Sequence, residues 1–112
     1  MKSIITFIAV AFLSFNAVAE VNSSQKQALI DLYNSTNGAE WNNTWDLNAD
    51  VSTWYGVRVV NNAVVGLNLS MNNLNGQLPE TLGDLDSLVT LELFFNRIQG
   101  EIPASIGNLK NL

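Results

Sequence analysis

A repeat with a period of 24 residues is the feature that most constrains how this chain can fold. Residues 64–87, VVGLNLSMNNLNGQLPETLGDLDS, align without a gap on residues 88–111, LVTLELFFNRIQGEIPASIGNLKN, and Leu112 begins a third copy. Self-similarity at a period of roughly 20–50 residues is typical of stacked repeats, so the sequence predicts a stack of coils. The two copies also share four special residues, at the pairs Asn72/Asn96, Gly76/Gly100, Pro79/Pro103 and Gly83/Gly107.

Each copy opens with a short alternating segment, Leu67-x-Leu69 or Leu91-x-Leu93, which predicts a strand with one apolar face. Stacking would place these strands side by side in a parallel sheet, with their leucines in an inner row. Each leucine contributes about 2–3 kcal/mol when it is fully buried. The shared asparagine follows the strand where the chain must turn, so we expect its buried amide to pair with backbone groups of the neighbouring coil.

The second half of each copy predicts a return segment. Gly76 and Gly100 permit backbone angles that other residues resist. The prolines that follow them hold the chain extended and leave no backbone donor unpaired. Four aliphatic residues then point back into the interior: Leu82, Leu85, Ile106 and Leu109.

The pattern L-x-x-L-x-L-x-x-N-x-L-x-G-x-[LI]-P-x-x-[LI]-G-x-L in residues 64–112 resembles the leucine-rich repeat family. Its 24-residue spacing is similar to the plant extracellular type, which also occurs in bacterial exported proteins. The resemblance implies an α/β fold, a right-handed solenoid with short parallel β-strands on its concave face. It also implies non-catalytic binding of other proteins, peptides or glycans through that face.

A short amphipathic helix is predicted ahead of the repeats, over residues 25–35. Ser24 with Gln27 three residues later fits a capping box, and Asn37-Gly38 ends the pattern. Leu29 and Leu32 fall on one helical face together with Tyr33. A helix of about ten residues is too short to stand alone in water, so we expect it to pack on the open end of the first repeat.

Three tryptophans, Trp41, Trp45 and Trp54, lie between this helix and a predicted strand over residues 57–60, which leads through the turn Asn61-Asn62 into the first repeat. The segment Trp54-Tyr55-Gly56-Val57 resembles the W-x-G-V element in the N-terminal cap of extracellular leucine-rich repeat proteins. The resemblance therefore implies a helical, Trp-rich cap over residues 20–63. Plant caps carry a cysteine pair that this sequence lacks, which favours bacterial exported relatives. A stacking platform for sugar is the alternative interpretation of the tryptophans.

Residues 1–19 have the layout of a secretory signal peptide. A positive start, Met1-Lys2, precedes an apolar run at 4–15 and the small-x-small ending Ala17-Val18-Ala19. The run is shorter than the roughly 20 residues that a membrane-spanning helix needs. The sequence therefore predicts a secreted protein, either extracellular or periplasmic.

The composition restricts the chemistry that the chain can perform. It contains no cysteine and no histidine, which excludes Cys–His and Ser–His–Asp catalysis and every metal site built on those ligands. The formal net charge of −5 argues against nucleic acid as a partner. A calcium-loop start at Asp46-Leu47-Asn48-Ala49-Asp50 fails because Val51 and Val57 stand where the loop needs Gly and Glu. We predict no catalytic, cofactor-binding or metal-binding residue, and we interpret Asp84 and Asp86 as solvated turn residues.

Two adjacent aromatic residues, Phe94 and Phe95, do not fit an inner row that already contains Leu91 and Leu93. Glu92 and Phe94 must point to the concave face instead, with Phe95 beside them at the strand's end. The previous copy supplies the equivalent positions, so the predicted partner-binding set, here the concave set, is Asn68, Ser70, Met71, Glu92, Phe94 and Phe95. In the alternative interpretation, Phe95 covers the edge of the core and only Phe94 is exposed.

Three other functions stay open beside the binding module. The chain could be the N-terminal ectodomain fragment of a larger receptor or enzyme, an inhibitor of polysaccharide-degrading enzymes, or an ice-surface binder. We also expect Leu109 and Leu112 at an uncovered apolar end, through which two copies could associate end to end.

Overall fold

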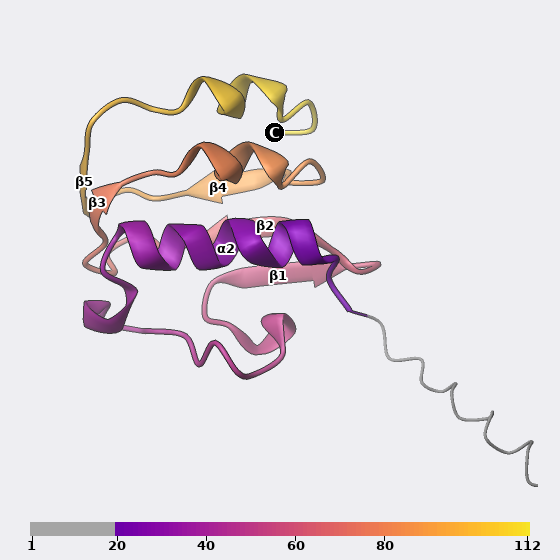
Figure 1. Ribbon diagram of the computed structural model, residues 1–112, viewed down its shortest axis with the longest axis horizontal. Coiled ribbons are helices and arrows are strands. Elements are labelled where there is room, and N and C mark those ends of the chain that lie inside the picture. Colours follow the sequence, from indigo (N-terminus) through magenta and orange to yellow (C-terminus); the bar gives the residue numbers. More distant parts are fainter. Residues whose placement is uncertain (1–19) are drawn as a thin grey trace, which may run out of the picture.

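The structure of the protein is a computed structural model that describes residues 20–112, so the predicted signal peptide lies outside the described residues. These residues form one α-helix, five short strands and four 3₁₀ turns (Figure 1). In chain order they are α2 (Ser23–Ser35), η1 (Gly38–Glu40), η2 (Val51–Thr53), β1 (Val57–Val60), β2 (Ala63–Asn68), β3 (Asn75–Gln77), η3 (Glu80–Asp84), β4 (Thr90–Glu92), β5 (Arg97–Gln99) and η4 (Ala104–Asn108).

Strands of successive repeats pair in parallel, as the period predicts. In the β1–β2–β4 sheet, Leu67 lies opposite Leu91 and Asn68 opposite Glu92, one full period apart. A second sheet pairs β3 with β5, where Gly76 lies opposite Ile98. The coils therefore stack one above the other, with one sheet on each of two sides (Figure 1).

The third side of the stack is a row of helical turns. Helix α2 packs against η3, and η3 packs against η4. Thr81 donates a hydrogen bond of 2.7 Å from its hydroxyl to Asp31 of α2. Helix α2 therefore stands where a 3₁₀ turn stands in each following coil.

The interior of the stack is an aliphatic column. Its leucines from the strands and the return segments have no more than 1% of their surface exposed, namely Leu67, Leu69, Leu74, Leu82, Leu85 and Leu88. Leu109 belongs to the same buried cluster, so the prediction that it lies at an uncovered end is wrong. Leu109 repeats the position of Leu85 and packs into the column, whereas Leu112 is half exposed.

The shared asparagines link neighbouring coils, which confirms the expected role of their amides. The Asn96 side-chain oxygen accepts hydrogen bonds of 3.0 Å from the backbone N–H groups of both Asn72 and Leu74. Its amide nitrogen donates to the carbonyls of Leu69 and Leu93 at 2.9 and 3.0 Å. Asn72 is fully buried and makes the same kind of bonds with Asn43, one coil earlier.

Residues 36–43 supply the backbone partners of the first repeat. The N–H of Asn75 donates to the carbonyl of Thr36, and the N–H of Asn42 donates to the carbonyl of Asn72, both at 3.1 Å. A side chain at Gly76 would collide with the carbonyl oxygen of Ser35, and its φ of +146° also disfavours other residues. The contact between these two coils therefore requires glycine at this position.

Helix α2 begins earlier than the sequence suggests, and its cap differs. Asn22, and not Ser24, is the N-cap, because its side chain accepts a hydrogen bond of 2.9 Å from the N–H of Gln25. Gln27 donates to Asp31 one turn onward and does not return to the helix start, so the capping box is absent. The buried Gln25 side chain bonds the Val64 N–H at 2.8 Å and Asp86 at 3.2 Å, which fastens α2 to the repeats.

The three tryptophans form one packed cluster. The rings of Trp41 and Trp45 meet edge to face at 4.8 Å, and those of Trp45 and Trp54 stack at 4.8 Å. Each indole N–H donates to a backbone carbonyl, and no ring has more than 5% of its surface exposed. The interpretation as a sugar-stacking platform is therefore wrong, because no ring face is free to stack on a ligand.

Replacing Asn96 with alanine tests the asparagine link. Asn96→Ala leaves two N–H groups and a carbonyl of the preceding coil without their partner, and each unpaired buried group costs about 1–3 kcal/mol. We expect a loss of roughly 3 kcal/mol in the free energy of unfolding, measured by urea denaturation followed by far-UV circular dichroism. The exposed Asn111→Ala is the matched control, with an expected change within about 0.5 kcal/mol. Equal stability of the two variants would contradict the role assigned to Asn96.

Candidate binding surface

Alternate residues of β2 and β4 point away from the aliphatic column, onto the outer face of the β1–β2–β4 sheet. Leu91 and Leu93 are half-buried and face inward, while Phe94 has 52% of its surface exposed. Asn68 and Glu92 lie opposite one another on adjacent strands and both are exposed. The structure thus brings these members of the concave set together on the outer face.

The aromatic members of the set form a pair at the end of β4. The rings of Phe94 and Phe95 meet edge to face, with their centres 5.3 Å apart. Phe95 has 78% of its surface exposed, so the alternative in which it covers the core edge is wrong. Met71, one period earlier, has 62% of its surface exposed. Three large apolar side chains therefore extend into solvent from consecutive coils.

The polar members of the set differ in accessibility. The Asn68 side-chain oxygen accepts a hydrogen bond of 3.1 Å from the N–H of Ser70 and so fixes the end of β2. The Ser70 hydroxyl is covered and has no hydrogen-bond partner among residues 20–112. Ser70 therefore contributes less to the exposed surface than Asn68 and Glu92 do.

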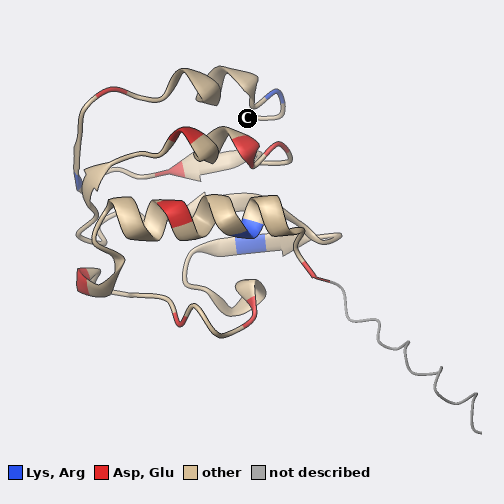
Figure 2. Ribbon diagram, in the orientation of Figure 1, with Lys and Arg blue, Asp and Glu red and all other residues tan. Residues whose placement is uncertain are grey.

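Two outer-face residues were missed by the sequence analysis, namely Arg58 and Thr90. Both lie opposite Gly66 in the sheet, and a side chain at Gly66 would lie 3.1 Å from the Thr90 hydroxyl and 3.3 Å from the Arg58 Cβ. Figure 2 shows a positive charge on β1, the strand of Arg58, and a negative charge on β4, the strand of Glu92. The alternating pattern of β1, together with the turn at Asn61-Asn62, could have indicated that Arg58 faces outward. A register shift between Arg58 and Val59 makes the pairing of β1 with β2 hard to predict from the sequence.

The carboxylates of the chain do not gather into a metal site. Within residues 20–112, no group of three or more acidic side chains is arranged to hold an ion. Asp50 accepts hydrogen bonds from the Ser52 backbone N–H at 2.9 Å and from its hydroxyl at 3.0 Å, and these bonds hold the pKa of Asp50 below its usual value. This carboxylate therefore stabilises its own turn.

A hollow at the far end of the stack is lined only by aliphatic side chains. It has a volume of about 310 Å³ and is formed by Leu78, Leu91, Leu93, Ile98, Ile102 and Ile106. Ile102 has 73% of its surface exposed. The hollow therefore lies over the last strands and the return segment, and not at Leu109.

Among the residues that the structure describes, no helix combines the length and the apolar character needed to cross a bilayer.

Solved structures with the same architecture come from plants and bacteria. One is the leucine-rich repeat ectodomain of the plant membrane receptor kinase GASSHO1/SCHENGEN3 from Arabidopsis thaliana, solved in complex with CASPARIAN STRIP INTEGRITY FACTOR 2. It is 29% identical to this chain, with a TM-score of 0.69, and the match covers 79% of this chain and 11% of that one. A plant ice-binding protein is 29% identical, with a TM-score of 0.66, over 83% of this chain and 31% of that one. A leucine-rich repeat protein from Bacteroides eggerthii DSM 20697 is 27% identical, with a TM-score of 0.57, over 61% and 12%.

The chain therefore spans less than a third of the length of these three proteins. No curated protein matches it. The family model "Leucine Rich Repeat" matches residues 64–85 and 87–109, which are the two copies found in the sequence. With matching repeats, stacked parallel strands and these structural neighbours, residues 64–109 are leucine-rich repeats.

Proposed function

We propose that the protein is a secreted, non-catalytic leucine-rich repeat module that binds a protein, peptide or glycan through the concave set. The observation that carries this proposal is the cluster of exposed apolar side chains at Met71, Phe94 and Phe95. Adjoining exposed aromatic residues are typical of contact surfaces, where they supply most of the binding energy.

The proposal divides the chain into three parts. Residues 1–19 direct export to the periplasm or the extracellular space, residues 20–63 form an N-terminal cap, and residues 64–112 form right-handed repeats. The bonds of Gln25 to Val64 and Asp86 support the cap, because they join α2 to the first and second repeats. The tryptophan cluster supports it further, because it belongs to the same buried core as the repeat leucines and so joins residues 41–54 to the repeats.

Rigid display is the proposed mechanism. The Asn72 and Asn96 side chains fix the turns that follow β2 and β4, so the outer residues are held in place before a ligand arrives. A surface that needs little reordering loses less conformational entropy on binding. The receptor ectodomain solved in complex with CASPARIAN STRIP INTEGRITY FACTOR 2 supports partner binding as the kind of function.

Removing the aromatic pair tests the proposal. We expect Phe94→Ala combined with Phe95→Ala to weaken partner binding at least about tenfold, since buried aromatic anchors are worth roughly 2 kcal/mol or more at an interface. Both rings are more than half exposed, so the free energy of unfolding should change by less than about 1 kcal/mol. The measurement is quantitative capture of partners from the native extracellular fraction by the immobilised protein, compared between wild type and variant by mass spectrometry.

Val60→Ala is the control for that experiment. Val60 is also an exposed apolar residue, but it lies at the far end of β1. If the double variant captures the same proteins to the same extent as Val60→Ala, or if it unfolds, the concave set is not the binding surface.

A second candidate function is ice binding, which the similarity to a plant ice-binding protein favours. The regular β3–β5 face would be the surface concerned, and there Asn75 lies opposite Arg97 and Gln77 opposite Gln99. Only the glutamine pair repeats the same side chain on consecutive coils, whereas ice binding needs a regular array. The array is therefore short, and this candidate has the weaker structural support.

Thermal hysteresis measured on growing ice crystals distinguishes the two candidates. Ice binding through β3–β5 predicts hysteresis that persists in the Phe94→Ala, Phe95→Ala variant and is lost in Gln99→Lys, which places a charge in the glutamine pair. The concave-face proposal predicts no hysteresis in any of these proteins.

We also propose that the aliphatic hollow at the end of the stack joins two copies of the chain end to end. Each copy presents the same apolar side chains, so their contact would remove both surfaces from water. Light scattering across a dilution series should show a dimer that Ile102→Lys converts to monomer, because the substitution places a charge in the contact. Val60→Lys adds the same charge elsewhere and should leave the dimer intact. A protein that is monomeric at every concentration would refute this contact.

A further inference from the structure

A shallow recess of about 480 Å³ lies where β2 and β4 end, next to the concave set. It shares Met71 and Phe95 with that set, so the two surfaces are continuous. The residues that line it come from three successive coils: Asn42, Met71, Asn73, Phe95, Asn96 and Arg97.

The two apolar walls of the recess have an unfavourable backbone. Met71 and Phe95 have φ values of +55° and +57°, in the left-handed region that bulky side chains rarely adopt. Asn73 has a φ of +62°, but asparagine tolerates this conformation. Asparagine or glycine would form the turns at 71 and 95 with less strain, and neither apolar side chain is packed in the core. Strained residues that do not stabilise the fold point to a function.

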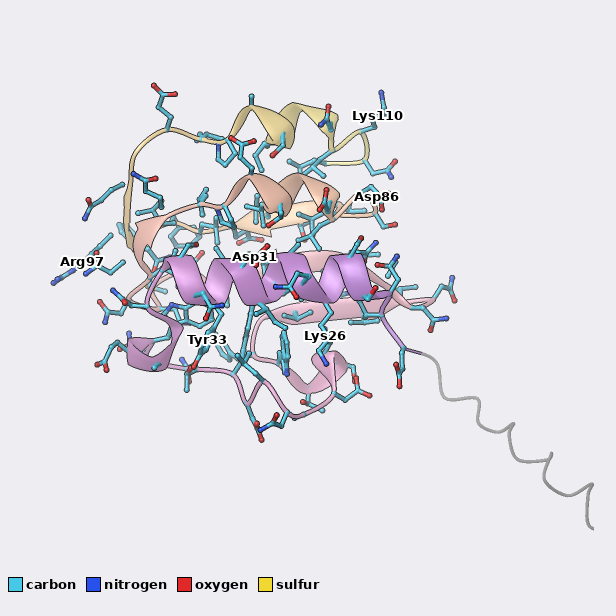
Figure 3. All side chains as sticks on the ribbon, viewed as in Figure 1. Lys26, Asp31, Tyr33, Asp86, Arg97 and Lys110 are labelled. Carbon is cyan, nitrogen blue, oxygen red and sulfur yellow. The ribbon has the colours of Figure 1, made fainter. Side chains whose placement is uncertain are left out.

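The charge in the recess is positive and unopposed. Arg97 is its only ionisable lining residue, and its guanidinium makes no hydrogen bond or ion pair within residues 20–112. Figure 3 shows the Arg97 side chain extending outward from the edge of the molecule. The protein as a whole carries a net charge of −5, so the recess is a local exception that attracts a carboxylate. A guanidinium matches a carboxylate with two parallel N–H donors.

The asparagines of the recess add acceptors for a peptide backbone. The side-chain nitrogen of Asn42 donates to the Met71 carbonyl at 3.3 Å, and that of Asn73 donates to the Glu40 carbonyl at 3.0 Å. These bonds orient both amides and use only their donor ends. Their oxygens make no hydrogen bond within the described part of the chain, so each is available to accept an N–H from a ligand.

We propose that this recess binds an extended peptide segment that carries an aspartate or glutamate next to a bulky apolar residue. Arg97 binds the carboxylate, Met71 and Phe95 hold the apolar side chain between them, and Asn42 or Asn73 accepts a backbone N–H. The inference rests on the proposed binding function and deepens it, because it names the chemistry of the partner.

Blocked tetrapeptides provide the test, with acetyl-Gly-Asp-Phe-Gly-amide compared with the Gly-Asn-Phe-Gly and Gly-Asp-Ala-Gly versions. Amide chemical shifts of the full ¹⁵N-labelled chain are followed by NMR during titration. We expect the Asp-Phe peptide to shift the signals of Phe95 and Arg97, with affinity at least about fivefold above either of the other peptides, and roughly 0.5 M salt to reduce this advantage. Inorganic phosphate is a further probe, and equal shifts with phosphate alone would show a simple anion site and overturn the peptide proposal.

Two variants separate recognition from folding. Phe95→Asn should abolish the binding of the Asp-Phe peptide while raising the melting temperature, because asparagine tolerates a φ of +57°. Arg97→Gln should remove the preference for the Asp-Phe peptide over the Asn-Phe peptide. Arg58→Gln removes the same charge outside the recess and should keep the preference.

These measurements distinguish a failure of the recess proposal from a failure of the proposed binding function of the concave set. Shifts confined to Asn68 and Glu92, or no shift with any peptide, would overturn the recess as the peptide site. The capture experiment with Phe94→Ala alone, which leaves every lining residue of the recess in place, decides separately whether the concave set binds a partner. An unchanged preference in Arg97→Gln would also overturn the proposal.

Discussion

The amide of the repeated asparagine is the interaction on which the rest of the structure depends. A chain that turns after every strand leaves backbone groups inside the turn without partners, and water is excluded from them. Asn96 satisfies two N–H groups and two carbonyls of two coils with one side chain. Because the amide has a fixed size and reach, it also fixes how closely successive coils approach. The inner leucine column and the row of outer residues both follow from that spacing.

The N-terminal segment supports the first repeat with residues that do not follow the repeat pattern. The first repeat needs a coil beneath it, and residues 36–43 supply backbone partners for Asn72 and Asn75 although their sequence does not follow the repeat. Helix α2 continues the row of helical turns, and Gln25 holds it there through a buried side chain. The segment before the first repeat therefore provides the backbone partners and the helical turn that a preceding coil would otherwise provide.

The sequence predicted those parts of the structure that are set by periodicity. The parallel pairing of Leu67 with Leu91, the interior leucines and the buried asparagines all follow from one alignment of the chain on itself. Those parts that depend on competing local contacts were not predicted. Asn22 displaced Ser24 as the helix cap, because its side chain accepts the Gln25 N–H while Ser24 lies inside the helix and donates its hydroxyl to the same Asn22 side chain. Leu109 packs into the column, because its repeat position outweighs its nearness to the last residue.

The outer face of the sheet was likewise predictable from the sequence only where periodicity sets it. Alternation along β2 and β4 indicated which side chains face outward, but it gave no information on β1, which runs antiparallel and contains a register shift. The positive φ values of Met71 and Phe95 were also beyond prediction, since neither residue type favours them. Arg58, Thr90 and the recess beside Arg97 were therefore identified only from the structure.

The tryptophan cluster has a consequence for how the protein reaches its native state. Because the chain contains no cysteine, residues 41–54 are held without a disulfide, by ring packing, three indole N–H bonds and hydrogen bonds to the neighbouring coil. Folding of this segment therefore needs no oxidant and no thiol-exchange enzyme, and the folded form is indifferent to reducing agents. Such a chain can mature equally well in oxidising and in reducing surroundings.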